Sequence, residues 1–383
     1  MRAARFYNKG DIRVEEIPAP SLGPNQVIVD IEWGGICGSD LHEYLVGPLV
    51  INPPERPHSL TGEHIPVTLG HEFCGRISQV SAEAGENGWK VGDAVMVDPR
   101  LNCQKCEVCL RGDDNVCSKW GFLGLNGGGG GGAGFAEKCA VQSRMCYLLP
   151  ESVKLENAAL IEPLAVGRHA LNNSGFEDFS KLNILVVGGG PVGLSVLHNL
   201  RAKGAGKLYV SEPTAKRQQQ TREFADEVFN PLITNVAEEC RAKTNGAGVD
   251  LVFDCAGIPA GLKNGMDALR IKGTYVNVAG WEQPMVIPLQ FFMMKEIVLR
   301  TSMAYNDKDF RDVVEDFVAG QYSLPHITSV ALTLLGKFEG AEKMITSRIS
   351  LDDLAVKGFD ELVTKKDDHV KILATPKSSL LAH

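Results

Sequence analysis

Four cysteines lie close together with the spacing C-x2-C-x2-C-x7-C: Cys103, Cys106, Cys109 and Cys117. Gaps of two residues let successive thiolates turn back onto one tetrahedral ion, and four sulfur ligands leave no position open for a substrate. An iron–sulfur cluster is the competing interpretation, but ferredoxins use C-x2-C-x2-C-x3-C-P, and here Ser118 follows the last cysteine. The spacing therefore predicts a structural zinc site, and the chemistry of the protein must lie elsewhere.

Residues that could build a catalytic metal site occur in three other segments. They are Cys37-Gly38-Ser39-Asp40-Leu41-His42, Gly70-His71-Glu72 and Glu162-Pro163. A thiolate, an imidazole and a carboxylate are typical ligands of a catalytic zinc ion, whose open fourth position can bind an alcohol oxygen and stabilise the alkoxide. Each residue alone has an ordinary explanation, since a single cysteine is usually buried in a core and a glutamate before proline usually caps a helix.

A glycine-rich turn, Gly188-Gly189-Gly190-Pro191-Val192-Gly193, follows an apolar run and precedes a helical pattern. In such a G-x-G-x-x-G motif the first glycine permits a tight turn, the second lets the backbone approach a pyrophosphate, and the third lets the helix meet the strand. Glu212 follows Gly193 by nineteen residues, where a carboxylate would bind the adenosine ribose and repel a 2′-phosphate.

The motif therefore predicts binding of NAD(H) rather than NADP. Arg217 either flanks the ribose or is a solvated helix residue. The cofactor-contacting candidates are Gly188, Gly190, Val192, Gly193, Glu212 and Arg217.

The elements that would position these residues fall into two kinds. In roughly the first 150 residues, short alternating segments such as 27–33 and 93–97 predict a β-rich domain. After Leu182 strands alternate with helices, which predicts a parallel sheet in an α/β fold. The expected elements are strands at 183–187, 207–211, 249–254 and 273–278, and helices at 191–203 and 214–225. The tail, with a helix at 309–318 and a strand at 370–373, is expected to rejoin the first domain.

Composition excludes several classes of partner. The 383 residues carry a net charge of −8 with no basic cluster, which speaks against nucleic acid and anionic membranes. No signal peptide or transmembrane run is recognisable, and the ten cysteines favour a reducing compartment, so we expect a cytoplasmic protein. A run of six glycines, 127–132, could form a phosphate-binding nest but more often makes a flexible loop, and its role stays open.

Taken in order along nearly the whole chain, these motifs resemble the zinc-containing medium-chain alcohol and polyol dehydrogenases. Within that family the segments 36–44 and 210–213 are most similar to the (R,R)-2,3-butanediol dehydrogenases of fungi and bacteria. The resemblance implies an α/β protein with a GroES-like β-rich catalytic domain and a Rossmann domain with a doubly wound parallel sheet. The implied boundaries are 1–156 (zinc lobe at about 100–120), 157–302 and 303–383, with the last segment completing the catalytic domain.

The resemblance also implies roles for single residues. Cys37 and His71 match the ligands of the catalytic zinc, and Glu72 and Glu162 match carboxylates that bind it directly or through water, without showing which one binds at rest. Ser39 matches the hydroxyl that takes the alcohol proton, and His42 the histidine that passes it toward solvent. The implied cofactors are one catalytic and one structural Zn²⁺ per chain and NAD(H), and the implied assembly is a homodimer or homotetramer.

We therefore expect interconversion of a secondary alcohol or vicinal diol and its ketone, with (R,R)-2,3-butanediol and acetoin as the first candidates. Dehydrogenases of sorbitol, xylitol, threonine or larger hydroxy-ketones share every motif above and stay as alternatives. A non-catalytic structural member of the superfamily is disfavoured by the intact candidate ligands. A zinc-finger nucleic-acid module, suggested only by the cysteines, is disfavoured by the acidic charge.

Overall fold

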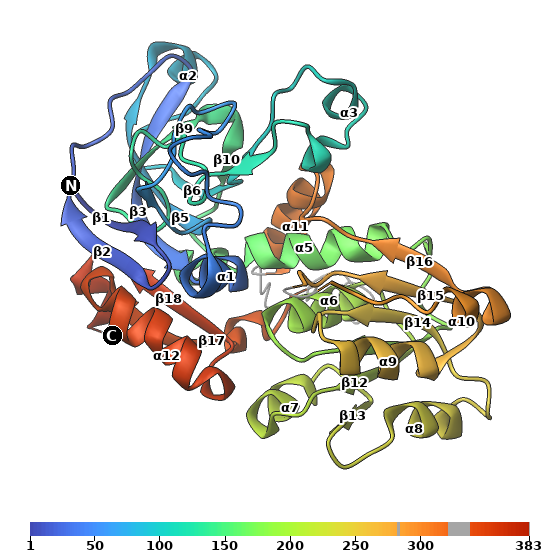
Figure 1. The fold of residues 1–383 in the computed structure, drawn as a ribbon. Coiled ribbons are helices and arrows are strands. Elements are labelled where there is room, and N and C mark those ends of the chain that lie inside the picture. The colour runs from blue at the N-terminus through green and yellow to red at the C-terminus, as the bar shows by residue number, and fades with distance from the viewer. Residues whose placement is uncertain (282–283, 321–337, 383) are drawn as a thin grey trace, which may run out of the picture. The chain divides into compact units, whose positions relative to one another are not determined.

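The computed structural model describes residues 1–281, 284–320 and 338–382 (Figure 1). The chain divides into two compact units. Unit 1 contains Met1–Glu162, Asn306–Tyr322 and Ile345–His383, and unit 2 contains Pro163–Tyr305 and Ser323–Met344. The first division thus follows Glu162, six residues after the expected boundary at 156, and the described residues 338–344 group with unit 2. Residues 321–337 of the expected C-terminal segment lie outside the described residues.

Unit 1 is built on a mixed sheet with the strand order β10-β6-β5-β3-β18-β17, and β9 also pairs with β3. The strands are β3 Gln26–Gly35, β5 Glu72–Val80, β6 Ala94–Val97, β9 Lys138–Gln142, β10 Cys146–Leu148, β17 Ile345–Ser350 and β18 Lys371–Thr375. The smaller sheets contain β1 Arg2–Asn8, β2 Asp11–Glu16 and β4 Val67–Thr68, and β7 Arg100–Leu101 and β8 Gly121–Phe122. The helices are α1 Gly38–Val46, α2 Ala82–Glu86, α3 Glu107–Leu110, α4 Leu155–Ala158, α11 Asp307–Gly320 and α12 Glu361–Thr364.

The long strand β3 organises this unit. It pairs antiparallel with β5 along its length, with β9 over its first half and with β18 at its end, where Leu373 lies opposite Gly35. Inward-facing apolar side chains of β3, β5, β6 and β9, including Val29, Phe73 and Val95, form a common core. The pairing of β18 with β3 joins the C-terminal tail to the main sheet of unit 1, between β3 and β17.

Unit 2 contains a parallel sheet with the strand order β13-β12-β11-β14-β15-β16, and Figure 1 shows helices flanking it. This is the order of a doubly wound nucleotide-binding fold. The strands are β11 Asn183–Val187, β12 Lys207–Ser211, β13 Glu227–Phe229, β14 Val249–Asp254, β15 Leu269–Asn277 and β16 Val298–Thr301. The helices are α5 Ile161–Asn172, whose first two residues belong to unit 1, α6 Pro191–Ala202, α7 Ala215–Thr221, α8 Val236–Lys243, α9 Pro259–Ala268 and α10 Leu289–Lys295.

The glycine run 127–132 is a loop, as expected, but a packed one. The N–H of Gly128 donates to Glu63 Oε1 at 2.7 Å, and Thr68 Oγ1 donates to the carbonyl of Gly131 at 2.5 Å. A Cβ at Gly132 would lie 1.9 Å from the carbonyl oxygen of Lys138, so only glycine fits there. Because a carboxylate of the chain itself already accepts from this loop, the structure favours a structural loop over a phosphate nest.

His198 of α6 is buried in unit 2 and should make stability depend on pH. Its ring packs 4.2 Å from that of Phe224, its Nε2 has no hydrogen-bond partner among the described residues, and burial lowers the pKa of His198 to about 4. The usual pKa of histidine is about 6.5, so between pH 6.5 and pH 4 the unfolded chain binds a proton that the folded chain does not. Lowering the pH through this range should therefore reduce the free energy of unfolding by up to about 3 kcal/mol. Denaturant titrations of wild type and His198→Leu at several pH values measure this loss of stability, which the variant should lack.

The matched control is His64→Leu, because His64 is exposed and its replacement should leave the pH dependence of stability unchanged. An equal pH dependence of stability in wild type and His198→Leu would contradict the assignment to His198.

Among the described residues, no helix is both long enough and apolar enough to cross a membrane.

Candidate metal and cofactor sites

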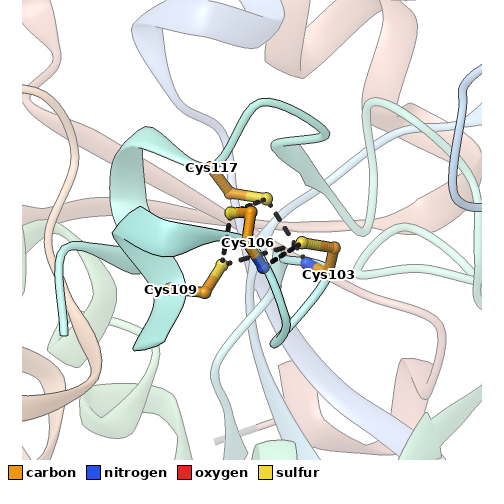
Figure 2. Close-up of side chains that lie close together, drawn as sticks. All are labelled: Cys103, Cys106, Cys109 and Cys117. Carbon is orange, nitrogen blue, oxygen red and sulfur yellow. Dashed lines mark hydrogen bonds between the residues drawn. The ribbon is translucent and has the colours of Figure 1, made fainter. Parts of the chain in front are cut away.

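The four clustered cysteines converge in space (Figure 2). The ligand atoms of Cys103, Cys106, Cys109 and Cys117 all lie within 4.8 Å of one another, with Sγ–Sγ distances of 3.4 Å between Cys106 and Cys109 and 3.8 Å between Cys106 and Cys117. A tetrahedral ion with Zn–S bonds of about 2.3 Å needs sulfurs about 3.8 Å apart. These residues therefore fit the predicted structural zinc.

Backbone amides around the cluster favour thiolates. The N–H of Cys106 donates to Cys103 Sγ at 3.3 Å, and the N–H of Lys119 donates to Cys117 Sγ at 3.3 Å. Backbone hydrogen bonds from Lys105 and Cys106 lower the pKa of Cys103 to about 6. Burial and the neighbouring cysteines raise the pKa of Cys109 to about 12, so a divalent cation would be needed to hold all four side chains as thiolates.

A buried arginine ties the cysteine lobe to the sheet. Arg100 of β7 binds Asp98 through Nη2 at 2.6 Å and Asp114, inside the lobe, through Nη1 at 2.8 Å. Asn102 Nδ2 also donates to Asp114 at 3.0 Å. The lobe is thus held at its base by a buried ion-pair network, while its own helix α3 has no buried side chain.

The second group of candidate ligands begins at the N-terminus of α1. Cys37 is the N-cap residue, and its N–H donates to Asp40 Oδ2 at 2.9 Å, so the third residue of the helix fixes the backbone at the thiol. Ser39 lies in the first turn, and His42 follows it by three residues, which places both on one side of α1. One short helix therefore carries the candidate thiolate ligand and both candidate proton carriers.

His71 links this helix to the start of β5. Its Nε2 lies 3.0 Å from Ser39 Oγ, it hydrogen bonds with the side chain of Cys37, and its Nδ1 lies 3.5 Å from Asp40 Oδ1. Burial lowers the pKa of His71, but the charges of Asp40 and Cys37 outweigh that effect and raise it well above its usual value. Surroundings that attract a proton to this imidazole also favour a metal cation, so Cys37 and His71 fit a zinc site as a pair.

Glu72 lies next to His71 but faces a different partner. Both of its carboxylate oxygens accept from Lys371 Nζ, at 2.6 and 2.7 Å, and Glu72 and Lys371 are 0% and 1% exposed. Burial lowers the pKa of Lys371, but Glu72, followed by Cys37 and Glu162, raises it above the usual lysine value. The sequence analysis did not identify Lys371 as a site residue. Its only signal there was that it is a charged residue inside the apolar strand expected in the tail.

Glu162 is buried in the first turn of α5, close enough to Lys371 to act on its charge. The structure thus brings Ser39 and Cys37 into contact with His71 and pairs Glu72 with Lys371, while the charge of Glu162 contributes to the raised pKa of Lys371. Among the described residues, only the four-cysteine set brings three or more potential ligands within 4.8 Å of one another. Which carboxylate completes the second metal site is therefore a matter of proposal.

The glycine turn in unit 2 has the geometry that its motif predicts. Gly188 has a φ of 95°, and a Cβ at Gly193 would lie 1.9 Å from the carbonyl oxygen of Gly188. Gly190 is the N-cap of α6 and Pro191 its first residue, so the free N–H groups at the start of this helix, including that of Val192, are available to an anion. The turn therefore fits a dinucleotide pyrophosphate.

Glu212 lies beside this turn. Its two oxygens accept from the N–H of Gly189 at 2.7 Å and from the N–H of Thr214 at 2.8 Å, and its side chain is buried. Each carboxylate oxygen can accept a further hydrogen bond, so the residue can also bind ribose hydroxyls. The guanidinium of Arg217 lies next to Gly190, since a Cβ there would be 3.7 Å from Arg217 Nη1.

Comparison with known proteins shows the family to which the chain belongs. Residues 23–151 match the alcohol dehydrogenase GroES-like domain, and residues 191–319 match the zinc-binding dehydrogenase family. The chain is 37% identical over 379 residues to the (R,R)-butanediol dehydrogenase of Neisseria gonorrhoeae, an alignment that covers 98% of this chain and 99% of the relative. The chain belongs to the zinc-binding alcohol dehydrogenase family.

This dehydrogenase is also 35% identical over 403 residues to the (R,R)-butanediol dehydrogenase of Saccharomyces cerevisiae, covering 99% of each chain. The crystal structure of 2R,3R-butanediol dehydrogenase from Bacillus subtilis matches it with a TM-score of 0.85 at 37% identity, covering 98% of this chain and 99% of that one. The predicted family, the two-part α/β fold and the class of enzyme are therefore confirmed. The protein is a zinc-dependent alcohol oxidoreductase that uses a nicotinamide cofactor.

Proposed function

We propose that this dehydrogenase interconverts (R,R)-2,3-butanediol and acetoin with NAD(H), and that each chain holds one structural and one catalytic zinc ion. The observation that carries the substrate is the similarity, at 35–37% identity over nearly the full length, to proteins named (R,R)-butanediol dehydrogenase. The preference for NAD over NADP is supported by the buried carboxylate of Glu212 beside the glycine turn, which would repel a 2′-phosphate.

The candidate residues of unit 1 are suited to binding an alcohol and moving its proton. Cys37 and His71, with a carboxylate, would hold the catalytic zinc, which when bound supplies the positive charge that stabilises an alkoxide. Ser39 Oγ, already a hydrogen-bond partner of His71, would accept the alcohol proton, and His42 on the same side of α1 would carry it toward solvent. NAD, when bound, would supply the hydride acceptor, so that one alcohol and NAD would give the ketone, NADH and one proton.

A substrate panel followed by NADH absorbance tests this proposal. We expect the highest kcat/KM with (R,R)-2,3-butanediol and NAD, and a value about 10- to 100-fold lower with the (S,S) isomer, because inverting both carbinol centres misplaces the hydroxyls and leaves polar groups of the site unpaired. NADP in place of NAD should be a poor cofactor. Faster turnover of sorbitol, xylitol or threonine would instead assign the protein to another specificity within its family.

We also propose that the enzyme is a homodimer or homotetramer. Strand β16 is at the end of the described sheet of unit 2, and exposed apolar side chains gather on it and on the preceding helix α10: Leu289, Met293, Met294 and Val298. An open strand edge beside such side chains is typical of a subunit interface. Light scattering that gives the 41.4 kDa mass of a single chain would contradict this proposal.

A cytoplasmic location stays part of the proposal. It is supported by the ten cysteines, all of which are free thiols in the structure. Recovery of the native protein in a membrane or secreted fraction would contradict it.

A further inference from the structure

The tail of unit 1 contains a π-helix, Leu354–Asp360, in the segment of the chain between β17 and β18. The hydrogen bonds of a π-helix run from residue i to residue i+5, so each turn is wider than in an α-helix, and such segments are frequent at functional sites. Leu354, Gly358 and Phe359 are buried, whereas Val356 is 67% exposed. In an α-helix, with about 3.6 residues per turn, Phe359 would lie about 140° away from Leu354. The wider turn therefore buries side chains that a regular helix would separate.

Gly358 lies against the residue that precedes the candidate thiolate ligand. A Cβ at Gly358 would be only 2.7 Å from Cδ1 of Ile36 and 3.1 Å from Cδ1 of Ile349. Ile36 is 3% exposed, and its N–H donates to the carbonyl of Ile372 at 3.0 Å, so the strand β18 also holds its backbone. Because Cys37 follows Ile36 directly, the packing at Gly358 bears on the position of Cys37 at the start of α1.

The next two residues of the π-helix contact α1 itself. The ring of Phe359 lies with its centre 5.2 Å from that of Tyr44, and the hydroxyl of Tyr44 donates to Asp360 Oδ1 at 2.8 Å. Tyr44 is on α1, two residues after the candidate proton carrier His42. The π-helix therefore contacts both the residue before the candidate thiolate ligand and the helix that the ligand begins.

Phe359 also contacts the support of the second candidate ligand. Its ring centre lies 6.5 Å from that of Phe135, with the two rings nearly perpendicular. Phe135 packs in turn on Gly70, where a Cβ would be 2.8 Å from the N–H nitrogen of Phe135 and 2.9 Å from its ring. The N–H of Gly134 donates to the carbonyl of Gly70 at 2.8 Å. His71 follows Gly70 directly, so one buried ring connects the π-helix to the backbone at this ligand.

On the basis of the catalytic zinc of the proposed function, we propose that the π-helix is a positioning element that sets the separation of Cys37 and His71. Gly358 acts on Cys37 through the side chain that precedes it, and Phe359 acts on His71 through an intervening aromatic ring. Zinc–ligand distances tolerate only about 0.2 Å of change. A small displacement of the π-helix should therefore weaken metal binding although none of its own residues is a candidate ligand.

A double-mutant cycle tests the path from Gly358 through Ile36. Gly358→Ala adds a methyl group that overlaps Cδ1 of Ile36, and it should lower the affinity of the catalytic zinc at least about tenfold, measured as retention against a chelator. Ile36→Val removes this same Cδ1, so the double variant should bind zinc within about threefold of the native chain. Ile349→Val removes the other neighbouring Cδ1 and is the matched control, which should not restore zinc binding in Gly358→Ala.

Two further measurements separate positioning from general destabilisation. Val141→Ala, in the core of unit 1 on β9, should lower the melting temperature without a comparable loss of zinc affinity. In the metal-free protein, hydrogen exchange over residues 36–46 should be at least about tenfold faster in Gly358→Ala than in the native chain, and unchanged in β11 of unit 2. If Gly358→Ala fails to fold, Tyr44→Phe still decides, because it removes only the hydrogen bond to Asp360 and should accelerate the same exchange and lower zinc affinity at least about threefold.

Three results would overturn the positioning role: unchanged zinc affinity in Gly358→Ala or Tyr44→Phe, no rescue by Ile36→Val, or an equal loss of zinc in Val141→Ala. Each of them would leave the proposed function standing. A native enzyme with a single zinc per chain and no alcohol turnover would instead end the proposed function itself.

Discussion

Replacing Cys37 with serine should lower kcat by at least about 10³-fold. Cys37 is held at the N-cap of α1 in contact with His71, and the variant removes the thiolate that we propose as a zinc ligand while nearly keeping the size of the side chain. Loss of the Lewis acid removes several kcal/mol of charge stabilisation from the transition state, and each 1.36 kcal/mol is a factor of ten in rate. NADH production from the alcohol measures the loss, and metal analysis should show one zinc fewer per chain.

The controls separate chemistry from folding. NADH binding, followed by tryptophan fluorescence, should be nearly unchanged in Cys37→Ser, because the glycine turn and Glu212 belong to unit 2. A matched Cys240→Ser change, in the core of unit 2, should reduce thermal stability without a comparable loss of kcat. Full turnover by Cys37→Ser would contradict the proposed zinc mechanism.

Replacing Cys106 with serine should unfold the cysteine lobe locally and remove its metal. Because α3 has only four residues and none of its side chains is buried, the proposed structural zinc would take the place of a hydrophobic core in this segment. Structural zinc sites contribute on the order of 10 kcal/mol to the folding of such small lobes. The variant should lose the structural zinc, gain protease cleavage sites between residues 103 and 117, and melt at a lower temperature.

The matched control for this prediction is Leu110→Ser. Leu110 is the last residue of α3 and is 76% exposed, so its replacement should change neither zinc content nor cleavage pattern. If Cys106→Ser kept its metal and its protease resistance, the lobe would not depend on zinc in the way we infer.

The sequence predicted the central elements of unit 2 well. The strands at 183–187, 207–211 and 249–254 match β11, β12 and β14, since buried parallel strands are continuous apolar runs between turn residues. The helix expected at 214–225 is shorter, Ala215–Thr221. The short strands β13 and β16 could not be recognised, because three or four partly exposed residues at the edge of a sheet carry little pattern.

The candidate site was predictable where a local motif defines it and hidden where distant segments meet. The cysteine spacing and the glycine turn specify their own geometry, and the structure reproduces both. The pair of Glu72 and Lys371 joins residues 299 positions apart, and only the pairing of β18 with β3 brings them together. Spacing alone could therefore name both candidate carboxylates but could not show that one of them already has a buried partner.

The position of β18 between β3 and β17 also determines when the sheet of unit 1 can be completed during synthesis of the chain. The ribosome makes β3 and β5 long before it makes β18, so a nascent chain carries an unfinished sheet on which β3 has no partner at this edge. Glu72 has no counter-ion until Lys371 of β18 has been made and has docked. A chain that stops before residue 371 should thus be an aggregation-prone polypeptide rather than a slightly weakened enzyme.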